Sequence, residues 1–239
     1  MIYGIASYRR PECRTVRTLL EAGVKRENIV ISTQCLEDYK EYKERHKLET
    51  LYRETDCAGG NRNTIIQAFS GQDILLLDDD ITGFVVHNGK RFLKNDLMFI
   101  EKVPWMFEFS KKNGATLFGI SATPNNLTRR ARYEYDFKVV LQGTVIGVVG
   151  GGARFDERFK MLEDYEISLR ETKSGGLRMR FNDYSIYKPK NGTNEGGMNE
   201  RYANGELKYW IDMLSRRHKE FLPNKDKTGG MAFFDRKEW

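Results

Sequence analysis

Three consecutive aspartates, Asp78, Asp79 and Asp80, directly follow the apolar run at 74–77. Such a run is typical of a central strand buried on both faces, which places the aspartates at the carboxyl end of that strand. Successive strand residues point to opposite faces, so the pattern predicts that Asp78 and Asp80 share a face and that Asp79 does not. Paired carboxylates are hard ligands suited to Mg²⁺ or Mn²⁺ together with a nucleotide diphosphate. The alternative is a solvated acidic turn that caps the next element.

A second acidic pair, Glu163 and Asp164, lies near the start of a segment at 161–171 that has helical periodicity. In the first turn of a helix beside a reaction centre, a carboxylate can accept the proton of an attacking hydroxyl group. An ordinary amphipathic helix has the same pattern, because acidic residues in its first turn interact favourably with its dipole. The pair is therefore a candidate general base that also has a purely structural explanation.

Two arginines occupy segments that we expect to be turns. Arg9 follows the predicted strand at 2–6, and Arg62 lies in the Gly-Gly-Asn-Arg-Asn segment at 59–63, before a predicted helix at 64–69. Guanidinium groups and free helix N-terminal amides suit a pyrophosphate, and they would stabilise the charge of a departing nucleoside diphosphate. Each arginine could equally be a surface residue.

The segments that must position these groups alternate between short apolar runs and helical patterns in the first half of the chain. This alternation indicates a mostly parallel sheet with crossover helices. The second half is expected to be more antiparallel, with apolar runs at 137–142 and 144–149 and an alternating strand at 178–187. The predicted fold class is therefore α/β. Strands are predicted at 2–6, 29–32, 74–77 and 116–121, helices at 37–47, 64–69, 97–111 and 161–171, and a hairpin at 84–92.

The composition fits one domain, or one domain with an appended lobe, since 39% of the 239 residues are hydrophobic and 31% are charged. Disordered and fibrous classes are excluded. The longest uncharged stretch, 139–153, contains five glycines and is shorter than the about 20 apolar residues that span a bilayer. We therefore expect no membrane span, and we see no secretory signal. Cys13, Cys35 and Cys57 form no CxxC pair, which favours the reducing cytoplasm.

Positive charge is concentrated in one part of the second half. The net charge of the whole chain is +6, and the segment 170–190 has six basic side chains against two acidic ones, a net charge of +4. This segment is the best candidate for a surface that faces a polyanion. A solvated edge strand would have the same composition.

Four segments, at 5–12, 60–63, 77–81 and 163–166, together and in this order resemble the GT-A fold nucleotide-sugar glycosyltransferases. Within that fold the chain is most similar to the base J glucosyltransferase and to the phage enzymes that glycosylate hydroxymethylated pyrimidines in DNA. The resemblance covers residues 1–190 and implies a GT-A-like, Rossmann-like mixed sheet with a small antiparallel region on the acceptor side. The implied organisation has a nucleotide-sugar-binding half at 1–120, an acceptor-binding half at 121–190, and a polar C-terminal extension at 191–239 that packs on the same domain.

The resemblance implies an inverting transfer of a hexose or pentose from a UDP-sugar to a hydroxyl group. Asp80 and Asp78 would hold Mn²⁺ or Mg²⁺. Asp164 would be the general base, with Glu163 orienting the acceptor or the base. Many relatives use a C-terminal histidine as a further metal ligand, but His218 has no supporting motif and that ligand stays unassigned. The residues implied in donor binding are Ser7, Tyr8, Arg9, Arg62, Asp78 and Asp79.

The implied acceptor is hydroxymethylcytosine or hydroxymethyluracil in DNA, which must leave the base stack before it can react. The cytoplasm that the cysteines favour would be the host cytoplasm if the enzyme is phage-encoded. Two alternatives stay open: a GT-A enzyme acting on a polysaccharide, lipid or protein, and a catalytically silent GT-A-like DNA-binding module. The residues implied in phosphate binding are Arg129, Arg130, Arg132, Lys173, Arg178, Arg180 and Lys188.

Overall fold

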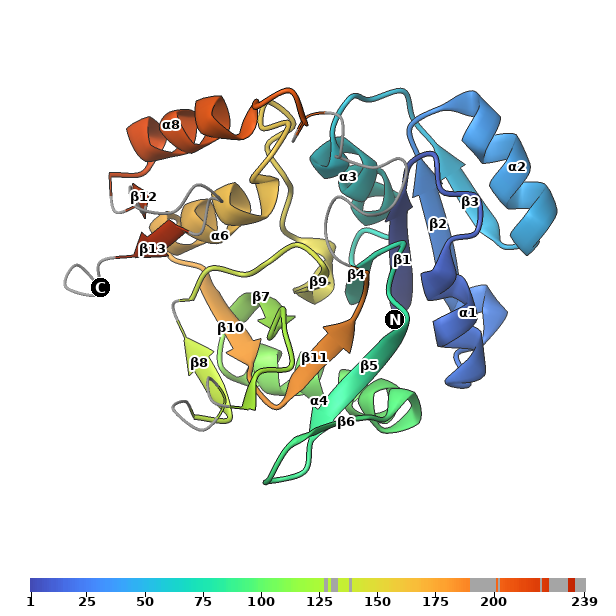
Figure 1. The fold of residues 1–239 in the computed structure, drawn as a ribbon, viewed down its shortest axis with the longest axis horizontal. Helices are drawn as coiled ribbons and strands as arrows, with labels where there is room; N and C mark the ends of the chain where they lie inside the picture. The colour runs from blue at the N-terminus through green and yellow to red at the C-terminus, as the bar shows by residue number, and fades with distance from the viewer. Residues whose placement is uncertain are drawn as a thin grey trace.

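A sheet of eight strands forms the centre of the molecule in this computed structural model (Figure 1). The structure describes residues 1–126, 129, 133–137, 139–189, 201, 203–219, 221–223 and 232–234. In spatial order the strands are β3 (Glu49–Tyr52), β2 (Ile29–Thr33), β1 (Ile2–Ser7), β4 (Ile74–Asp78), β9 (Val145–Val148), β7 (Ala115–Ile120), β10 (Leu177–Phe181) and β8 (Tyr135–Phe137).

The direction of the strands changes along the sheet. β3, β2, β1 and β4 are parallel to one another. β9 is antiparallel to both of its neighbours, while β10 is parallel to β7 and antiparallel to the edge strand β8. The predicted α/β class with a mostly parallel sheet is therefore confirmed, and the two antiparallel strands come from the second half of the chain.

Helices cover both faces of this sheet, and the uninterrupted apolar sequence of β4 follows from that arrangement (Figure 1). Leu75 and Leu77 pack in one core with residues of α1 and α4, whereas Ile74 and Leu76 pack in a second core with residues of α3 and α6. Both faces of β4 are thus buried, as the run predicted. The helices are α1 (Arg14–Glu21), α2 (Leu36–His46), α3 (Ala58–Ala68), α4 (Asp96–Lys112), α6 (Glu163–Lys173) and α8 (Leu207–Arg217), with 3₁₀ turns η1 (Arg26–Asn28) and η2 (Val149–Gly151).

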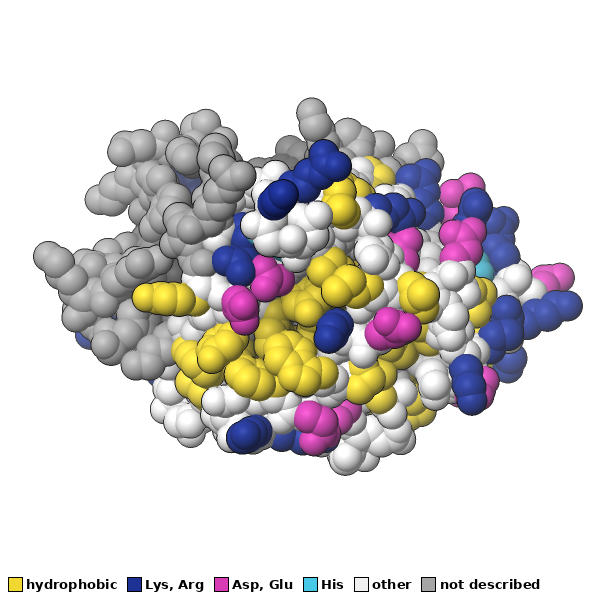
Figure 2. Space-filling model, turned by 90° about the horizontal axis from the view of Figure 1, so that it is seen from below, with side chains coloured by type: hydrophobic (Ala, Val, Ile, Leu, Met, Phe, Trp, Pro, Cys, Tyr) yellow, Lys and Arg dark blue, Asp and Glu magenta, His cyan; other side chains and the backbone are white. Residues whose placement is uncertain are grey.

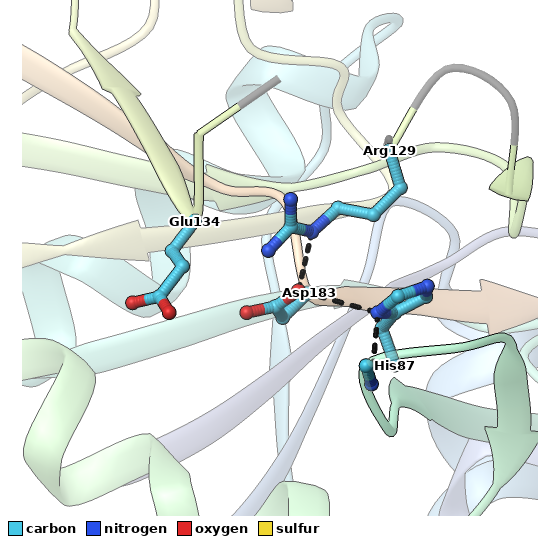
Figure 3. A pocket seen from close by; sticks show the side chains of 5 residues that line it. His87, Arg129, Glu134 and Asp183 are labelled. Atoms are coloured by element: carbon cyan, nitrogen blue, oxygen red, sulfur yellow. Dashed lines mark hydrogen bonds and ion pairs between the residues drawn. The ribbon is translucent and has the colours of Figure 1, made fainter. Parts of the chain in front are cut away.

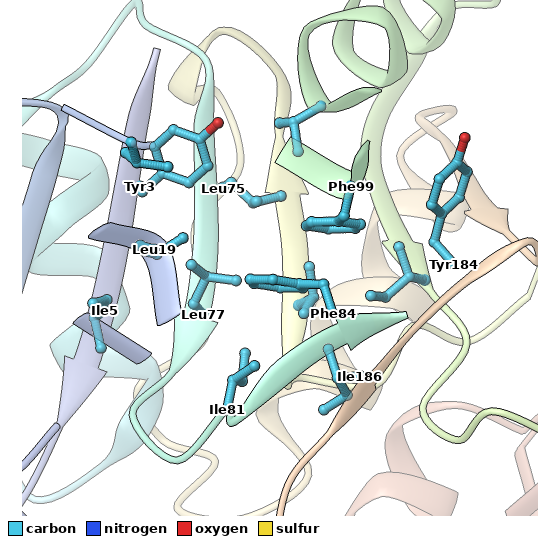
Figure 4. Packing of buried hydrophobic residues seen from close by; sticks show 14 of the residues in the cluster. Tyr3, Ile5, Leu19, Leu75, Leu77, Ile81, Phe84, Phe99, Tyr184 and Ile186 are labelled. Carbon is cyan, nitrogen blue, oxygen red and sulfur yellow. The ribbon is translucent and has the colours of Figure 1, made fainter. Parts of the chain in front are cut away.

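A small antiparallel sheet lies beside the main one. Its strands are, in order, β11 (Tyr184–Tyr187), β5 (Gly83–His87) and β6 (Phe92–Lys94). β5 and β6 form the predicted hairpin, and Gly89 in its Asn-Gly turn has φ 87, a conformation that favours glycine. Phe84 of β5 stacks on Phe99 of α4 with ring centroids 4.2 Å apart (Figure 4). The small sheet therefore shares the first core with the main sheet.

The segment 178–187 does not form the single strand that its alternation predicts. It is divided between β10 of the main sheet and β11 of the small sheet by a turn at Asn182 and Asp183. Asn182 Nδ2 donates to Tyr133 O at 2.9 Å and to Asp136 Oδ2 at 3.0 Å. The division thus depends on tertiary contacts, which an alternating pattern cannot reveal.

Helix α3 begins earlier than predicted, because the glycine-rich segment at 59–63 is helical and is not a turn. Cys57 is the N-cap, and its Sγ accepts from Gly60 N at 3.2 Å. A Cβ atom at Gly60 would lie 2.2 Å from Thr55 Oγ1. The glycine is therefore needed for a close approach between the helix and the preceding segment, and the arginine that follows it lies on a rigid element.

Two other boundaries also differ from the sequence prediction. Strand β3 was not predicted, and the apolar run at 137–142 contributes only Phe137 to a strand. Both elements are short and lie at or near an edge of the sheet, where apolar periodicity is weakest.

The C-terminal part of the chain packs through α8. Trp210 and Leu214 of this helix form a third core with Phe159, Met161 and Leu169. The last described strands are β12 (Phe221–Pro223) and β13 (Ala232–Phe234), which pair with each other. Among the helices of the described residues, none is both long and apolar enough to cross a membrane. All three cysteines are free thiols.

Hydrophobic side chains gather on the face of the molecule seen in Figure 2. Among the exposed aromatic residues, Trp105 of α4 stacks on Phe109 with centroids 5.2 Å apart. Phe109 in turn contacts Tyr135 of β8 at 5.0 Å, and Tyr135 contacts Phe137 at 5.6 Å. These ring contacts join the side chains of α4 to those of the edge strand β8.

Candidate active site

The three aspartates do not divide as strand alternation predicts. β4 ends at Asp78, and Asp79 and Asp80 lie in the turn that follows. Arg10 Nη1 donates to Asp79 Oδ1 at 2.7 Å and lies 3.5 Å from Asp80 Oδ2. Asp78 instead contacts Arg62, whose Nη2 donates to Asp78 Oδ1 at 3.0 Å. Asp79 and Asp80 therefore share a cation, and Asp78 is directed elsewhere, because the chain leaves the pleated conformation at this point.

Helix α1 fixes the backbone of this turn. Thr15 Oγ1 donates to Asp78 O at 2.6 Å and accepts from Ile81 N at 3.0 Å. Thr15 N also donates to Asp79 O at 3.2 Å. One buried threonine thus binds three backbone polar groups of the segment that carries the carboxylates.

Ser7 and Asp79, both predicted to bind the donor, are buried and paired with each other. Ser7 Oγ donates to Asp79 Oδ2 at 2.6 Å and lies 3.0 Å from the Tyr42 hydroxyl. Burial raises the pKa of Asp79 to about 6, although Arg10 and Ser7 act in the opposite direction. The Ser7–Asp79 pair therefore supports the turn from the protein interior. It lies at the carboxyl edge of the sheet, where the donor was predicted to bind.

Tyr8 and Arg9 lie closer to solvent, just beyond the carboxyl end of β1. Arg9 has φ 53, and its N donates to Asp38 Oδ2 at 2.7 Å. The Arg9 guanidinium lies 4.9 Å from the centre of the Tyr8 ring. Both side chains are placed where a nucleotide could contact them. Arg10, which the sequence analysis did not single out, is the residue that contacts the aspartates.

Arg62 joins the two acidic motifs. Its Nη1 donates to Glu163 Oε1 at 2.6 Å, and its Nη2 donates to Asp78 Oδ1 at 3.0 Å and to Gly143 O at 2.9 Å. The side chain is 5% exposed. Burial alone would lower the pKa of Arg62, but Glu163, Asp78 and Asp164 outweigh it and raise the pKa. Arg62 is therefore a buried charged link between the end of β4 and the start of α6.

Asp164 lies in the first turn of α6. Its Oδ2 accepts from Gly143 N at 2.6 Å, and its Oδ1 accepts from Tyr165 N at 2.9 Å. Burial and the adjacent Glu163 raise the pKa of Asp164 to about 7, against the lowering effect of Arg62 and of the two amides. A carboxyl group with a pKa near neutrality is suited to accept a proton from an attacking hydroxyl.

Gly143 is a part of the site that the sequence analysis missed. A Cβ atom at this position would lie 3.1 Å from Arg62 Nη1 and 3.2 Å from Asp164 Cβ. The absence of a side chain lets the backbone carbonyl accept from Arg62 while the backbone amide donates to Asp164. Nothing local in the sequence distinguishes this glycine from those in ordinary turns.

Lys188, predicted to bind DNA phosphate, lies in the candidate active site instead. It follows β11, and its Nζ is 3.5 Å from Asp78 Oδ2 and 3.3 Å from Thr144 Oγ1. The contact with Asp78 spans 110 positions in the sequence. A basic composition between 170 and 190 could not reveal this position.

Among the described residues of the segment at 170–190, the basic side chains of Lys173, Arg178 and Arg180 have different surroundings. Arg178 is 1% exposed and donates to Val139 O and Ser168 O in the interior, so a phosphate cannot reach it there. Arg180 pairs with Asp136 at 3.0 Å, and Lys173 is exposed on α6. The prediction of a phosphate contact at Arg178 is therefore wrong, because its side chain is buried, and the guanidinium of Arg180 already pairs with an acidic side chain. Arg130 and Arg132 lie outside the described residues.

Arg129 belongs to a different feature, an open pocket of about 370 Å³ (Figure 3). It forms an ion pair with Asp183, which also lies 3.8 Å from His87 Nδ1. Glu134 completes the charged lining. The pocket contains none of the residues predicted to bind the donor or to act in catalysis.

The aspartate turn, residues 78–80, fits a divalent cation in one respect, the chemistry of its ligand atoms. Asp78 and Asp80 supply hard carboxylate oxygens, and the Asp78 side chain is 27% exposed. Within the described part of the chain, no group of three or more His, Cys, Asp or Glu side chains is placed to hold a metal. His218 is buried beside Glu166, with 3.9 Å between Nε2 and Oε1. A metal here would therefore depend on the diphosphate of the donor for further ligands.

Comparisons with known proteins give one family match. The model of the family described as TET-Associated Glycosyltransferase matches residues 1–197. No curated protein matches. Similar solved structures include CMP:2-keto-3-deoxy-manno-octonic acid synthetase complexed with CTP, at 8% identity over 90% of this chain and 98% of that one, with a TM-score of 0.48. UDP-glucose pyrophosphorylase from Acinetobacter baumanii has 11% identity over 92% and 95%, with a TM-score of 0.41.

Proposed function

Since this chain belongs to the TET-associated glycosyltransferase family and is a glycosyltransferase, we propose that it transfers a sugar from a UDP-sugar to a 5-hydroxymethylpyrimidine in DNA, with inversion. The observation that carries the proposal is the link through Arg62, which brings the aspartate turn and the Glu163–Asp164 pair together. In this proposal residues 1–120 bind the donor and residues 121–190 bind the acceptor, with 191–239 as an extension of the same cytoplasmic protein.

The proposed reaction is a single displacement at the anomeric carbon. The hydroxymethyl oxygen of the acceptor attacks that carbon and loses its proton to Asp164. The bond from the anomeric carbon to the β-phosphate oxygen breaks, and its electron pair stays on the departing nucleoside diphosphate. Glu163 orients Asp164 or the acceptor, and the positive charge of Arg62 lies between the two acidic motifs.

A divalent cation held by Asp78 and Asp80 would supply Lewis-acid stabilisation of the leaving diphosphate. At the carboxyl edge of β1, the half-buried Tyr8 and the exposed Arg9 are the side chains that would contact the nucleotide. Arg10 keeps the turn in place by pairing with Asp79. These residues would orient the donor so that the anomeric carbon faces Asp164.

The proposed function predicts a mass gain in modified DNA. Hydroxymethylcytosine and hydroxymethyluracil DNA would be incubated with the protein, Mn²⁺ or Mg²⁺ and a panel of UDP-sugars, and the nucleosides analysed by mass spectrometry. We expect a hexose or pentose to be added to one of the two bases. The reaction without donor is the control. Donor hydrolysis without a mass gain would move the acceptor away from DNA, and no turnover of any donor would contradict the proposed donor class.

DNA binding by this enzyme is expected to depend strongly on salt. About three phosphate contacts would weaken binding about 40-fold between 50 and 200 mM salt, because counterions are released. Lys173 is exposed on α6, so Lys173→Gln should reduce the slope of log affinity against log salt by about 0.9. Fluorescence anisotropy of labelled DNA measures the slope of log affinity against log salt for each protein. Lys102→Gln on the exposed face of α4 is the control, and equal slopes in all three proteins would exclude a phosphate contact at Lys173.

A further inference from the structure

Lys188 lies at the aspartate turn because the end of β11, in the small sheet, is hydrogen-bonded to the loop that follows β4 of the main sheet. The residue before it, Tyr187, ends β11, and its carbonyl accepts from Thr82 N at 2.9 Å and from Thr82 Oγ1 at 3.1 Å. Thr82 directly follows the aspartate turn and Ile81 in the sequence. The backbone beside Lys188 is therefore fixed to the same loop that carries Asp78 and Asp80.

The Lys188 side chain makes a loose contact in a partly open place. Its Nζ lies 3.5 Å from Asp78 Oδ2 and 3.3 Å from Thr144 Oγ1, and the side chains of Lys188 and Asp78 are 23% and 27% exposed. An ion pair of this length and exposure contributes little, so it separates readily. A lysine ammonium is a compact charge on a flexible stem and can change partners at small cost.

The two oxygens of Asp78 therefore have different partners. Oδ1 accepts from the buried Arg62, whose other contacts hold it in place, whereas Oδ2 faces the movable Lys188. A divalent cation would also bind Oδ2. Binding Oδ1 would require the metal to displace Arg62, and the buried guanidinium charge would then lose its contact with Asp78. Lysine and metal thus compete for one carboxylate oxygen.

We propose that Lys188 neutralises Asp78 while the donor site is empty and that it binds the diphosphate of the donor once a metal takes its place. The inference rests on the proposed function, since it assigns a second cation to the same donor site. When it binds the diphosphate, Lys188 donates charge-assisted hydrogen bonds to the phosphate oxygens. Its positive charge stabilises the negative charge on the departing nucleoside diphosphate. Lys188 is thus assigned to the donor site and is removed from the set of residues that bind DNA.

This assignment predicts two opposite effects of one substitution. In Lys188→Met the competing charge is gone, so Mn²⁺ alone should bind the nucleotide-free protein about two- to fivefold more tightly, the range of an exposed ion pair. UDP in the presence of saturating Mn²⁺ should bind about tenfold more weakly, because a charge-assisted hydrogen bond is lost. A residue with a merely structural role would not move the two affinities in opposite directions.

The experiment measures free Mn²⁺ by electron paramagnetic resonance and UDP binding by calorimetry, in the full chain. Lys188→Arg is expected to restore UDP binding, and Lys102→Met, on the exposed face of α4, is the matched control. Unchanged or equally weakened affinities in Lys188→Met would overturn the assignment. Thermal unfolding shows whether each variant is folded. If Lys188→Met is not folded, the Mn²⁺ and UDP affinities of Lys188→Arg decide the outcome.

Failure of this inference can be told apart from failure of the proposed function. If wild-type protein turns over a UDP-sugar but Lys188→Met binds Mn²⁺ and UDP as the wild type does, the glycosyltransferase proposal stands and the role of Lys188 is rejected. If the wild-type protein binds neither Mn²⁺ nor UDP, the donor assignment itself is rejected and the inference with it.

Discussion

Replacement of Asp164 by asparagine is expected to lower kcat for sugar transfer by about 10²- to 10⁴-fold, the range that general-base catalysis contributes. Asparagine keeps the size of the side chain but cannot take the proton of the acceptor hydroxyl. Initial rates on modified DNA, measured beside an Asp212→Asn control on the exposed face of α8, test this expectation. A loss of less than about fivefold would exclude Asp164 as the base.

The pH dependence gives an independent test of the same residue. Because the pKa of Asp164 is raised to about 7, the carboxyl group is mostly protonated below that pH and cannot act as a base. Wild-type kcat/KM should therefore rise with pH through about 7 and then level off, whereas the residual activity of Asp164→Asn should lack this limb.

Glu163 supplies a further check on the assignment. It is one of the causes of the raised pKa of Asp164, through repulsion between neighbouring carboxylates. Glu163→Gln removes that repulsion and should shift the acidic limb of the profile to lower pH. An unchanged limb would mean that a different group titrates in the profile.

The parts of this site that the sequence predicted are those with local signals. The aspartate turn was predicted because both faces of β4 are buried, so its apolar run is continuous up to the first carboxylate. Asp164 was predicted because acidic residues at a helix start leave a local pattern. The mostly parallel sheet followed from the alternation of strands and helices in the first half.

The residues that were missed or misplaced depend on contacts between distant parts of the chain. Arg10 contacts Asp79 across 69 positions, and Lys188 contacts Asp78 across 110 positions. Composition cannot distinguish a basic residue that faces DNA from one such as Arg178, which is buried in the interior. The sequence thus supplied the candidate reacting groups and Arg62, whereas the positions of Arg10 and Lys188 beside the aspartates were located only by the fold.

Replacement of Arg62 by methionine is expected to destabilise the protein by about 3 kcal/mol, the lower end of the range for breaking a buried ion pair, since Asp78 is partly exposed. For a chain of this length, that loss should lower Tm by about 6–12 °C. Sugar transfer should fall further than the loss of folded protein explains, because the link between Asp78 and Glu163 is gone. Thermal unfolding and initial rates, measured below the Tm of the variant, separate the two effects.

The destabilisation has a specific cause that a second substitution can test. Without Arg62, the buried Glu163 carboxylate has lost the guanidinium at 2.6 Å, so Glu163→Gln added to Arg62→Met should recover part of the lost stability. Arg62→Lys keeps one charge but cannot reach Glu163, Asp78 and Gly143 O together, and should recover less activity than stability. Additive losses in the double variant would mean that Arg62 and Glu163 do not act as a pair. The two acidic motifs would then be connected through the backbone at 143–144, where Gly143 N donates to Asp164 and Thr144 O accepts from Asp78 N.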